Sequence, residues 1–394
     1  MSQSHAPALS RRRFLVRVAG GAMLALTGAD LWSLIRGAGA EPAKDGLMTR
    51  VTRPQLLETP VEDFTSWITP NERFFVRSHF GPPPADALHN WRLHVEGDVA
   101  RSLTLSLADL QALEEVTVPA VVQCSGNGRA FFTPKVPGAQ WEKGAVGNAR
   151  WTGVRLADVL KRAGVGPRAR HLQLLGADRP VLPTVPLFTR SIPLEKAMHP
   201  ATLLAYRMNG DPLPLLHGAP LRVIVPGWAG DACVKWLTHL TLREHEADGF
   251  YMQTAYRMPI KPVMPGAVVK PSDMVPVEDM VVQSLIARPT DGAALGGGVI
   301  LVEGVAWTGE AEIVRVDVSV DGGKMWSEAE LIGDQAPYAW RLWRYRWREA
   351  RPGAYTVMSR AADSRGHVQP MAMTWNPSGY LWNAVDHVNV RVTG

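Results

Sequence analysis

The chain has 394 residues, of which 46% are hydrophobic and 20% are charged. This composition is typical of a globular protein with room for two domains, and it excludes a disordered chain. Five arginines and one aspartate in the first 40 residues account for +4 of the net charge of +5, so the remaining +1 argues against nucleic acid as a partner.

The first 40 residues have the pattern of an export signal. Arg11, Arg12 and Arg13 precede an apolar stretch that ends near Ile35, and the small residues 38–40 follow. This order is typical of a twin-arginine signal with a cleavage site, which predicts a periplasmic protein. A membrane anchor is the alternative, but the stretch is short and interrupted by glycines and an aspartate, so we expect no stable membrane span in the mature form.

The segment from 41 to about 70 is polar and contains several prolines, and a mixture of strand and helix patterns follows it. The pattern predicts helices over 106–113 and 156–163, and strands over 118–123, 171–175, 221–225 and 234–242. Because strands and helices do not alternate regularly, we predict an α+β catalytic domain over 41–265 rather than a doubly wound sheet.

Several prolines between 258 and 280 indicate a linker, which we place at 266–280. Beyond it, Val314, Val316, Val318 and Val320 alternate with polar residues, and further strand-like runs follow at 337–347 and 354–361. The sequence therefore predicts an immunoglobulin-like β-sandwich over 281–394.

Cys124 and Cys233 are the two cysteines, too few for a disulfide framework, and neither lies in a Cys-x-x-Cys-His run. Covalent c-type haem is therefore excluded. Cys124 ends a strand-like run and is followed by two glycines and Arg129, so its thiolate would be exposed beside a cation and able to bind a metal. A buried structural cysteine is the alternative interpretation.

Two basic clusters could bind an oxyanion. One runs from Asn71 to His79, and the other from His217 to Arg222 and on to Lys235. Guanidinium groups and nearby glycine turns suit phosphate or sulfate. Each cluster alone could equally be a solvated loop.

Read together, these segments resemble the molybdenum domain of sulfite oxidases over nearly the whole mature chain. The blocks that carry the resemblance are Phe75 to His79, Cys124 to Asn127, Met208 to Gly210, His217 to Arg222 and Val234 to Trp236. The C-terminal part is similar to the dimerisation domain of that family, through Gly304 to Trp307, Val318 to Gly323 and Arg360 to Asp363. The resemblance therefore implies a homodimer.

The resemblance implies a molybdenum-molybdopterin cofactor, with Cys124 as a thiolate ligand to the metal. Soft sulfur ligands suit a metal that cycles between oxidation states. The residues assigned to the cofactor are Phe75, His79, Cys124, Asp178, His217, Arg222, Cys233, Val234 and Lys235. We expect Cys233 to contribute no bond to the metal.

The resemblance places Arg77, Arg129, Trp141 and Tyr256 in the substrate pocket. Two guanidinium groups would neutralise a dianion, and a phenol could hydrogen-bond a metal oxo group. A structural tyrosine is the alternative for Tyr256. Animal and plant sulfite oxidases carry a further arginine where this chain has Ser378, in the run Trp375 to Gly379, so the anion pocket is expected to be less positive or rebuilt.

We therefore expect oxidation of a small oxyanion, sulfite, with electrons passed to an external carrier such as a c-type cytochrome. About 30 residues between Glu41 and Asn71 are too few for a haem domain there. The alternatives are an exported molybdopterin-dependent sulfoxide reductase, which would generally lack the C-terminal sandwich, and a cofactor-free binding protein that keeps the fold.

Overall fold

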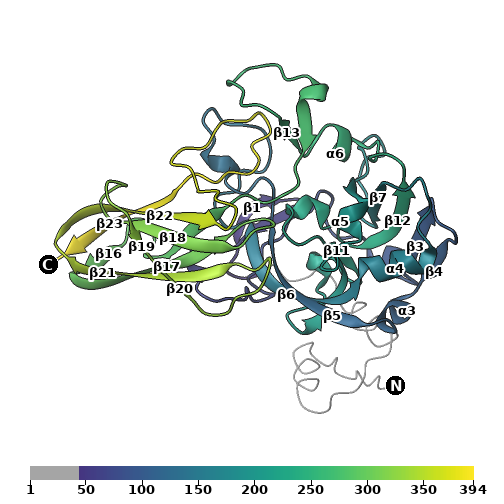
Figure 1. Ribbon diagram of the computed structural model, residues 1–394, viewed down its shortest axis with the longest axis horizontal. Helices are drawn as coiled ribbons and strands as arrows, with labels where there is room; N and C mark the ends of the chain where they lie inside the picture. The colour runs from purple at the N-terminus through teal and green to yellow at the C-terminus, as the bar shows by residue number, and fades with distance from the viewer. Residues whose placement is uncertain (1–43) are drawn as a thin grey trace, which may run out of the picture. The chain divides into compact units, whose positions relative to one another are not determined.

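The structure is a computed structural model and describes residues 44–394 (Figure 1). The export signal predicted at 1–40 lies outside these residues. No helix within 44–394 is both long enough and apolar enough to cross a membrane.

The described residues are mostly β-structure, so the α+β prediction overstates the helical content. Four short α-helices occur in them: α3 (Leu107–Gln111), α4 (Leu156–Ala163), α5 (Leu194–Ala197) and α6 (Phe250–Gln253). The 3-10 helices are η1 (Val61–Asp63), η2 (Ala85–Leu88), η3 (Arg129–Phe131), η4 (Leu215–His217), η5 (Gly230–Ala232) and η6 (Pro271–Asp273). The helices predicted over 106–113 and 156–163 correspond to α3 and α4. A capping box formed by Ser106 and Asp109 starts α3.

The first large sheet of the N-terminal part is antiparallel and leads directly into the Cys124 loop. Its order is β10 (Asp211–Pro212), β9 (Leu203–Met208), β6 (Val146–Arg155) and β5 (Glu115–Gln123), and β11 (Arg222–Ile224) also pairs with β9. The backbone N–H of Cys124 donates to the carbonyl of Ala145, 2.9 Å away, just beyond the last β5–β6 pair. The thiol therefore lies where a paired strand becomes a loop.

The second sheet of this part brings Asp178 and Lys235 to one edge. Its order is β4 (Leu103–Leu105), β3 (Leu93–Gly97), β12 (Leu237–Arg243), β7 (His171–Gly176) and β8 (Thr189–Pro193), with β3 and β12 parallel and the other pairs antiparallel. Leu237 opens β12 opposite Gly176, the last residue of β7. Asp178 follows β7 and Lys235 precedes β12, so both lie at this edge.

The strand predicted over 234–242 needs correction, whereas the linker predicted at 266–280 stays a prediction, although this segment contains short elements. The strand predicted over 234–242 begins only at Leu237, because Trp236 has a φ of +50° and the preceding residues form a loop. The segment predicted as a linker, 266–280, holds η6 and β14 (Met274–Pro276), which pairs with β13 (Arg257–Pro259). A further small sheet pairs β1 (Met48–Thr52) with β2 (Gln55–Glu58).

The C-terminal part consists of two sheets around one apolar core. The first has the order β15 (Gln283–Arg288), β17 (Gly298–Trp307), β21 (Arg341–Ala350) and β20 (Glu330–Ile332). The second has the order β16 (Ala294–Gly296), β23 (Asp386–Thr393), β22 (Gly353–Asp363), β18 (Ile313–Ser319) and β19 (Ser327–Glu328). Val302 and Trp343 from the first sheet pack in one cluster with Val316, Val357 and Val390 from the second.

A second apolar cluster joins the two parts of the described chain. Phe64 and Val121 come from the N-terminal part and pack with Trp307 and Trp340 from the C-terminal part. The indole N–H of Trp67 donates to the carbonyl of Trp340, 3.0 Å away, and the Trp340 indole donates to the carbonyl of Trp67, 2.7 Å away. Both indole donors are thus satisfied where the two parts meet.

Trp340→Ala should reduce the free energy of unfolding by about 3–5 kcal/mol, because a fully buried indole is lost at this junction. Urea denaturation followed by fluorescence measures the change. Met325→Ala, at a side chain that is 75% exposed, serves as the control and should leave the midpoint nearly unchanged. Equal midpoints for the two variants would contradict the role given to the Trp340 cluster.

Candidate functional site

One pocket gathers most of the residues singled out from the sequence. Its empty volume is about 700 Å³, part of which is open to solvent. Eleven of the thirteen predicted site residues line it: Phe75, Arg77, His79, Cys124, Asp178, His217, Arg222, Cys233, Val234, Lys235 and Tyr256. Residues far apart in the chain therefore form one site, although their individual roles remain predictions.

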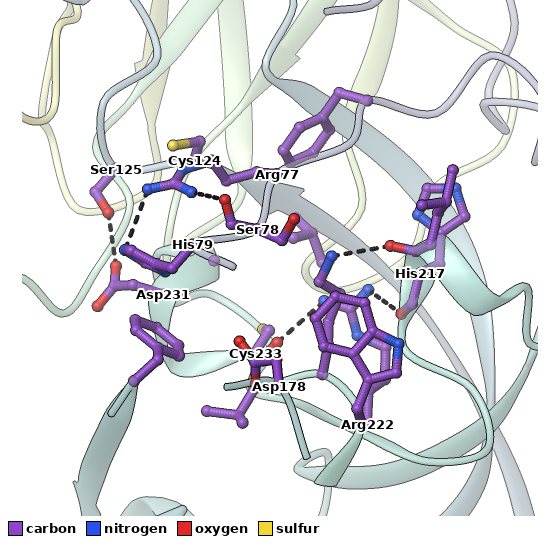
Figure 2. A pocket seen from close by; sticks show the side chains of 18 of the residues that line it. Arg77, Ser78, His79, Cys124, Ser125, Asp178, His217, Arg222, Asp231 and Cys233 are labelled. Atoms are coloured by element: carbon purple, nitrogen blue, oxygen red, sulfur yellow. Dashed lines mark hydrogen bonds between the residues drawn. The ribbon is translucent and has the colours of Figure 1, made fainter. Parts of the chain in front are cut away.

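The Cys124 thiol lies at one end of this pocket, beside the Arg77 guanidinium (Figure 2). The side chain of Asn127 fixes the loop after the cysteine, since it accepts a hydrogen bond from the Ala145 N–H at 2.9 Å and donates to the Lys143 carbonyl at 3.2 Å. Cys124 is free and partly exposed. A soft sulfur donor is thus presented to the pocket on a fixed loop.

His79 connects Arg77 with Tyr256. Its Nε2 is 3.1 Å from a nitrogen of Arg77 and 2.9 Å from the hydroxyl of Tyr256. Burial, with the Arg77 charge next in importance, holds the pKa of His79 well below its usual range, so the ring is neutral. Since a guanidinium has no acceptor, Nε2 must accept from Arg77, which assigns the ring proton to Nδ1.

The other end of the pocket is basic and is built on two interlocked loops (Figure 2). The Arg222 guanidinium donates to the carbonyls of His217, at 2.9 Å, and Cys233, at 3.2 Å. The Lys235 ammonium donates to the carbonyl of Leu216, 2.9 Å away. These bonds tie the loop that contains His217 to the loop before β12.

The electrostatics of this end favour a bound anion. Burial, and then the Arg222 charge, hold the pKa of Lys235 well below its usual range. Burial lowers the pKa of Arg222 to about 10. Asp178 is the nearby acid, and burial raises the pKa of its carboxyl to about 6 even though Lys235 acts to lower it. A phosphate group would relieve the mutual repulsion of the buried cations.

Arg129 and Trp141 do not line the pocket. The Arg129 guanidinium lies over the ring of Tyr380, 5.1 Å from its centroid, and donates to the carbonyls of Ala139 and Ser378. Tyr380 in turn stacks on Tyr256, with ring centroids 5.5 Å apart. Arg129 is thus separated from Tyr256 by one aromatic ring.

Trp141 is completely buried, and its ring meets that of Phe75 edge to face at a centroid distance of 6.4 Å. Its indole N–H has no hydrogen-bond partner within residues 44–394. The structure therefore places it behind the pocket wall, and its assignment to the substrate pocket remains a prediction.

The sequence analysis did not identify several residues that line the pocket. They are Phe74, Ser78, Val122, Ser125, Phe188, Leu216, Gly230, Asp231 and Trp236. Ser78, Ser125 and Trp236 directly adjoin predicted residues, so proximity in sequence was a usable signal. For Phe188 and Asp231 no local motif signals a site, because only the tertiary fold brings their segments to the pocket.

The residues present fit a molybdopterin. The pocket offers one free thiol at one end and a buried basic cradle at the other, as a metal bound to a pterin with a phosphate group requires. The Nε of Arg222 is buried and has no partner among the described residues, so this donor is available to a bound group. Cys124 would hold the metal, while His217, Arg222 and Lys235 would hold the phosphate-bearing part.

Comparisons with known proteins agree with this geometry. Residues 79–251 match the family described as "Oxidoreductase molybdopterin binding domain", and residues 274–393 match the "Mo-co oxidoreductase dimerisation domain". The mitochondrial sulfite oxidase of Mus musculus is 40% identical over 357 residues, which cover 86% of this chain and 64% of that enzyme. The sulfite oxidase of Gallus gallus is 37% identical over 363 residues, with coverage of 88% and 78%.

A solved structure is similar over almost the whole chain. The sulfane dehydrogenase SoxCD of Paracoccus pantotrophus has a TM-score of 0.76 and 26% sequence identity, and the match covers 99% of this chain and 96% of that one. The fold and the pocket thus define an oxidoreductase that binds a molybdenum-molybdopterin cofactor. The similarity to the animal enzymes is more specific, and the chain belongs to the sulfite oxidase family.

The cofactor-free protein should lose stability below about pH 6.5. Burial, and then Lys44, Lys235 and Arg222, hold the pKa of His217 well below the 6.5 of the unfolded chain. As the pH is lowered through this range, the unfolded state binds a proton that the folded state does not. The free energy of unfolding therefore decreases by up to about 1.4 kcal/mol for each pH unit of acidification, for this group.

Urea midpoints of the cofactor-free protein at several pH values between about 7 and 5 measure this dependence. His217→Gln should show a shallower decline than the parent, whatever its stability at neutral pH. Parallel curves for the two proteins would contradict the assignment of a neutral, buried His217.

Proposed function

We propose that this protein is a sulfite dehydrogenase that oxidises sulfite to sulfate and passes the electrons to an external carrier such as a c-type cytochrome. The observation that carries the proposal is the thiol end of the pocket, where Cys124, Arg77, His79 and Tyr256 converge. Sulfite oxidases are the curated relatives of highest identity given above, and the chain spans 64% of the length of the mouse enzyme.

The residues at this end have complementary tasks. Arg77 attracts and orients the anion through its fixed charge, and neutral His79 holds that guanidinium in place by accepting its hydrogen bond. Burial raises the pKa of Tyr256, so its hydroxyl keeps its proton and can donate a hydrogen bond. Cys124 would hold the metal as a thiolate ligand. When bound, the cofactor would supply the oxygen-atom transfer and the capacity for two electrons.

A second candidate substrate for the same site is a compound with sulfane sulfur. The likeness to the sulfane dehydrogenase over the whole chain favours it, as does Ser378 at the position where animal and plant sulfite oxidases carry an arginine. The sulfoxide reductase remains a weaker alternative, because the match of 274–393 to a dimerisation domain favours an oxidase.

The sequence contains no Cys-x-x-Cys-His run, which supports an external haem carrier. Arg11 and Arg12 support export to the periplasm directed by the signal at 1–40, which the mature protein would lack. The two-sheet C-terminal part supports an immunoglobulin-like dimerisation domain over 281–394 and a homodimer.

A steady-state assay distinguishes these reactions. The purified, cofactor-loaded protein is given sulfite with oxidised cytochrome c, a sulfane compound such as thiosulfate with the same acceptor, or methionine sulfoxide with a reduced dye. We expect sulfite-dependent reduction of cytochrome c and no oxidation of the dye. Turnover with methionine sulfoxide alone would refute the proposed direction of the reaction.

Cys124→Ser should leave a folded protein with little or no turnover, because a hydroxyl is a poor replacement for a thiolate ligand. Circular dichroism checks the fold and the cytochrome c assay checks activity. Cys233→Ser is the matched control. It should keep most activity, because the Cys233 thiol is buried and only accepts the Val225 N–H at 3.4 Å. Activity like that of the parent in Cys124→Ser would refute the ligand assignment.

Arg77→Gln should raise the KM for sulfite by about 10–100-fold, the cost of one or two hydrogen bonds to a charged group. Sulfate should inhibit this variant less than the parent. Arg129→Gln should have a smaller effect, because Arg129 lies behind Tyr380. Arg92→Gln, whose side chain donates only to nearby carbonyls, is the control. Equal sulfate inhibition in the parent and Arg77→Gln would count against Arg77 as an anion ligand.

A further inference from the structure

A buried ion pair lies directly beside the pocket. Arg190, in β8, and Asp231, in η5, approach to 2.7 Å, and each side chain is only 2% exposed. Burying two charges is costly, and such a pair often contributes no net stability compared with apolar residues. The contacts of the two side chains indicate a role other than stability.

Asp231 connects this pair to the cysteine loop. Its Oδ1 accepts a hydrogen bond from the hydroxyl of Ser125 at 2.7 Å (Figure 2), and Ser125 is 2% exposed. Ser125 directly follows Cys124, so a fixed Ser125 side chain restricts the backbone that carries the thiol. The carbonyl of Ser125 also accepts from the Leu381 N–H at 2.9 Å.

Arg190 connects the same pair to the segment that carries Tyr256. One of its terminal nitrogens donates to the carbonyl of Tyr251 at 2.5 Å, and its guanidinium carbon lies 5.2 Å from the centroid of the Tyr256 ring. The Tyr256 hydroxyl in turn reaches His79. A cation held against the face of a ring restrains the position of that ring.

We propose that Ser125, Asp231 and Arg190 form a positioning network that sets the Cys124 thiol and the Tyr256 phenol in one fixed arrangement. None of the three is a catalytic residue in this proposal, because they act through Cys124 and Tyr256. The network joins the loop after β5, strand β8, η5 and the segment after α6. The proposal rests on the proposed function in so far as Cys124 binds the metal.

The test compares the loaded parent with Ser125→Ala. Visible absorption reports sulfur-to-metal charge transfer and so the bond made by the thiolate, and this readout requires no turnover. We expect the variant to retain its molybdenum content but to show a shifted charge-transfer band. Its kcat should fall by about tenfold or more with KM within about twofold, since misplacing reacting groups mainly slows the reaction step.

The matched control is Thr308→Val. Thr308 also donates a buried hydroxyl to a carboxylate, that of Asp363 at 3.1 Å, but in the C-terminal part and away from the pocket. This variant should lower Tm without moving the band or kcat. The double variant Arg190→Gln with Asp231→Asn removes both charges at once, so no buried charge is left unpaired. It should reproduce the band shift of Ser125→Ala, and it decides the question if the single variant does not fold.

If Ser125→Ala has the same band position and kcat as the parent and only a lower Tm, the role of Ser125 is purely structural. That result would overturn the proposal. If the loaded parent does not oxidise sulfite but Ser125→Ala still shifts the charge-transfer band, the network is supported and the proposed function is refuted. The two failures are therefore distinguishable. If Cys124→Ser itself leaves the band unchanged, the ligand assignment fails and the network loses its purpose.

Discussion

The constraint on which the site depends is the burial of several cations in one pocket. Arg77, Arg222 and Lys235 line it, and burial disfavours the charged form of the nearby Asp178 carboxyl, whose pKa is raised to about 6. Backbone carbonyls from the two interlocked loops accept hydrogen bonds from Arg222 and Lys235. The remaining positive potential makes the pocket receptive to an anionic cofactor and, at the thiol end, to an anionic substrate.

Holding such a pocket together requires rigid support, which the β-structure provides from several directions. Gln123 is the last residue of β5, and its side chain donates to Gln283 at 3.0 Å and accepts from the indole of Trp307 at 3.1 Å. Both partners belong to the C-terminal sheet that begins with β15. The residue immediately before Cys124 is thus anchored to the C-terminal part, so the position of the thiol depends on packing between the two parts.

Residues of the site could be predicted from the sequence where a short motif contains them, and could not where only the tertiary fold brings them together. Short motifs identified Arg77, Cys124 and Lys235, because each motif keeps its functional residues within a few positions. The Arg190–Asp231 pair has no such signal, since its members are 41 positions apart and meet only when β8 packs beside η5. The predicted start of the strand was wrong at Trp236. The backbone and indole N–H groups of this residue donate to the loop that contains His217, so the residue does not join the sheet despite its strand-like sequence.

Ser378 stands where the resemblance leads us to expect an arginine, and the contacts of this residue are local. The carbonyl of Ser378 accepts from Arg129 and its hydroxyl donates to the carbonyl of Arg257 at 2.7 Å, so this segment holds Arg129 in place without adding a charge. Arg129 then faces Tyr380 rather than the pocket lining. At the thiol end the lining therefore presents the charge of Arg77, supported by His79 and Tyr256. Buried contacts fix the surroundings of this guanidinium, because His79 lies 3.1 Å from Arg77 and 2.9 Å from the hydroxyl of Tyr256.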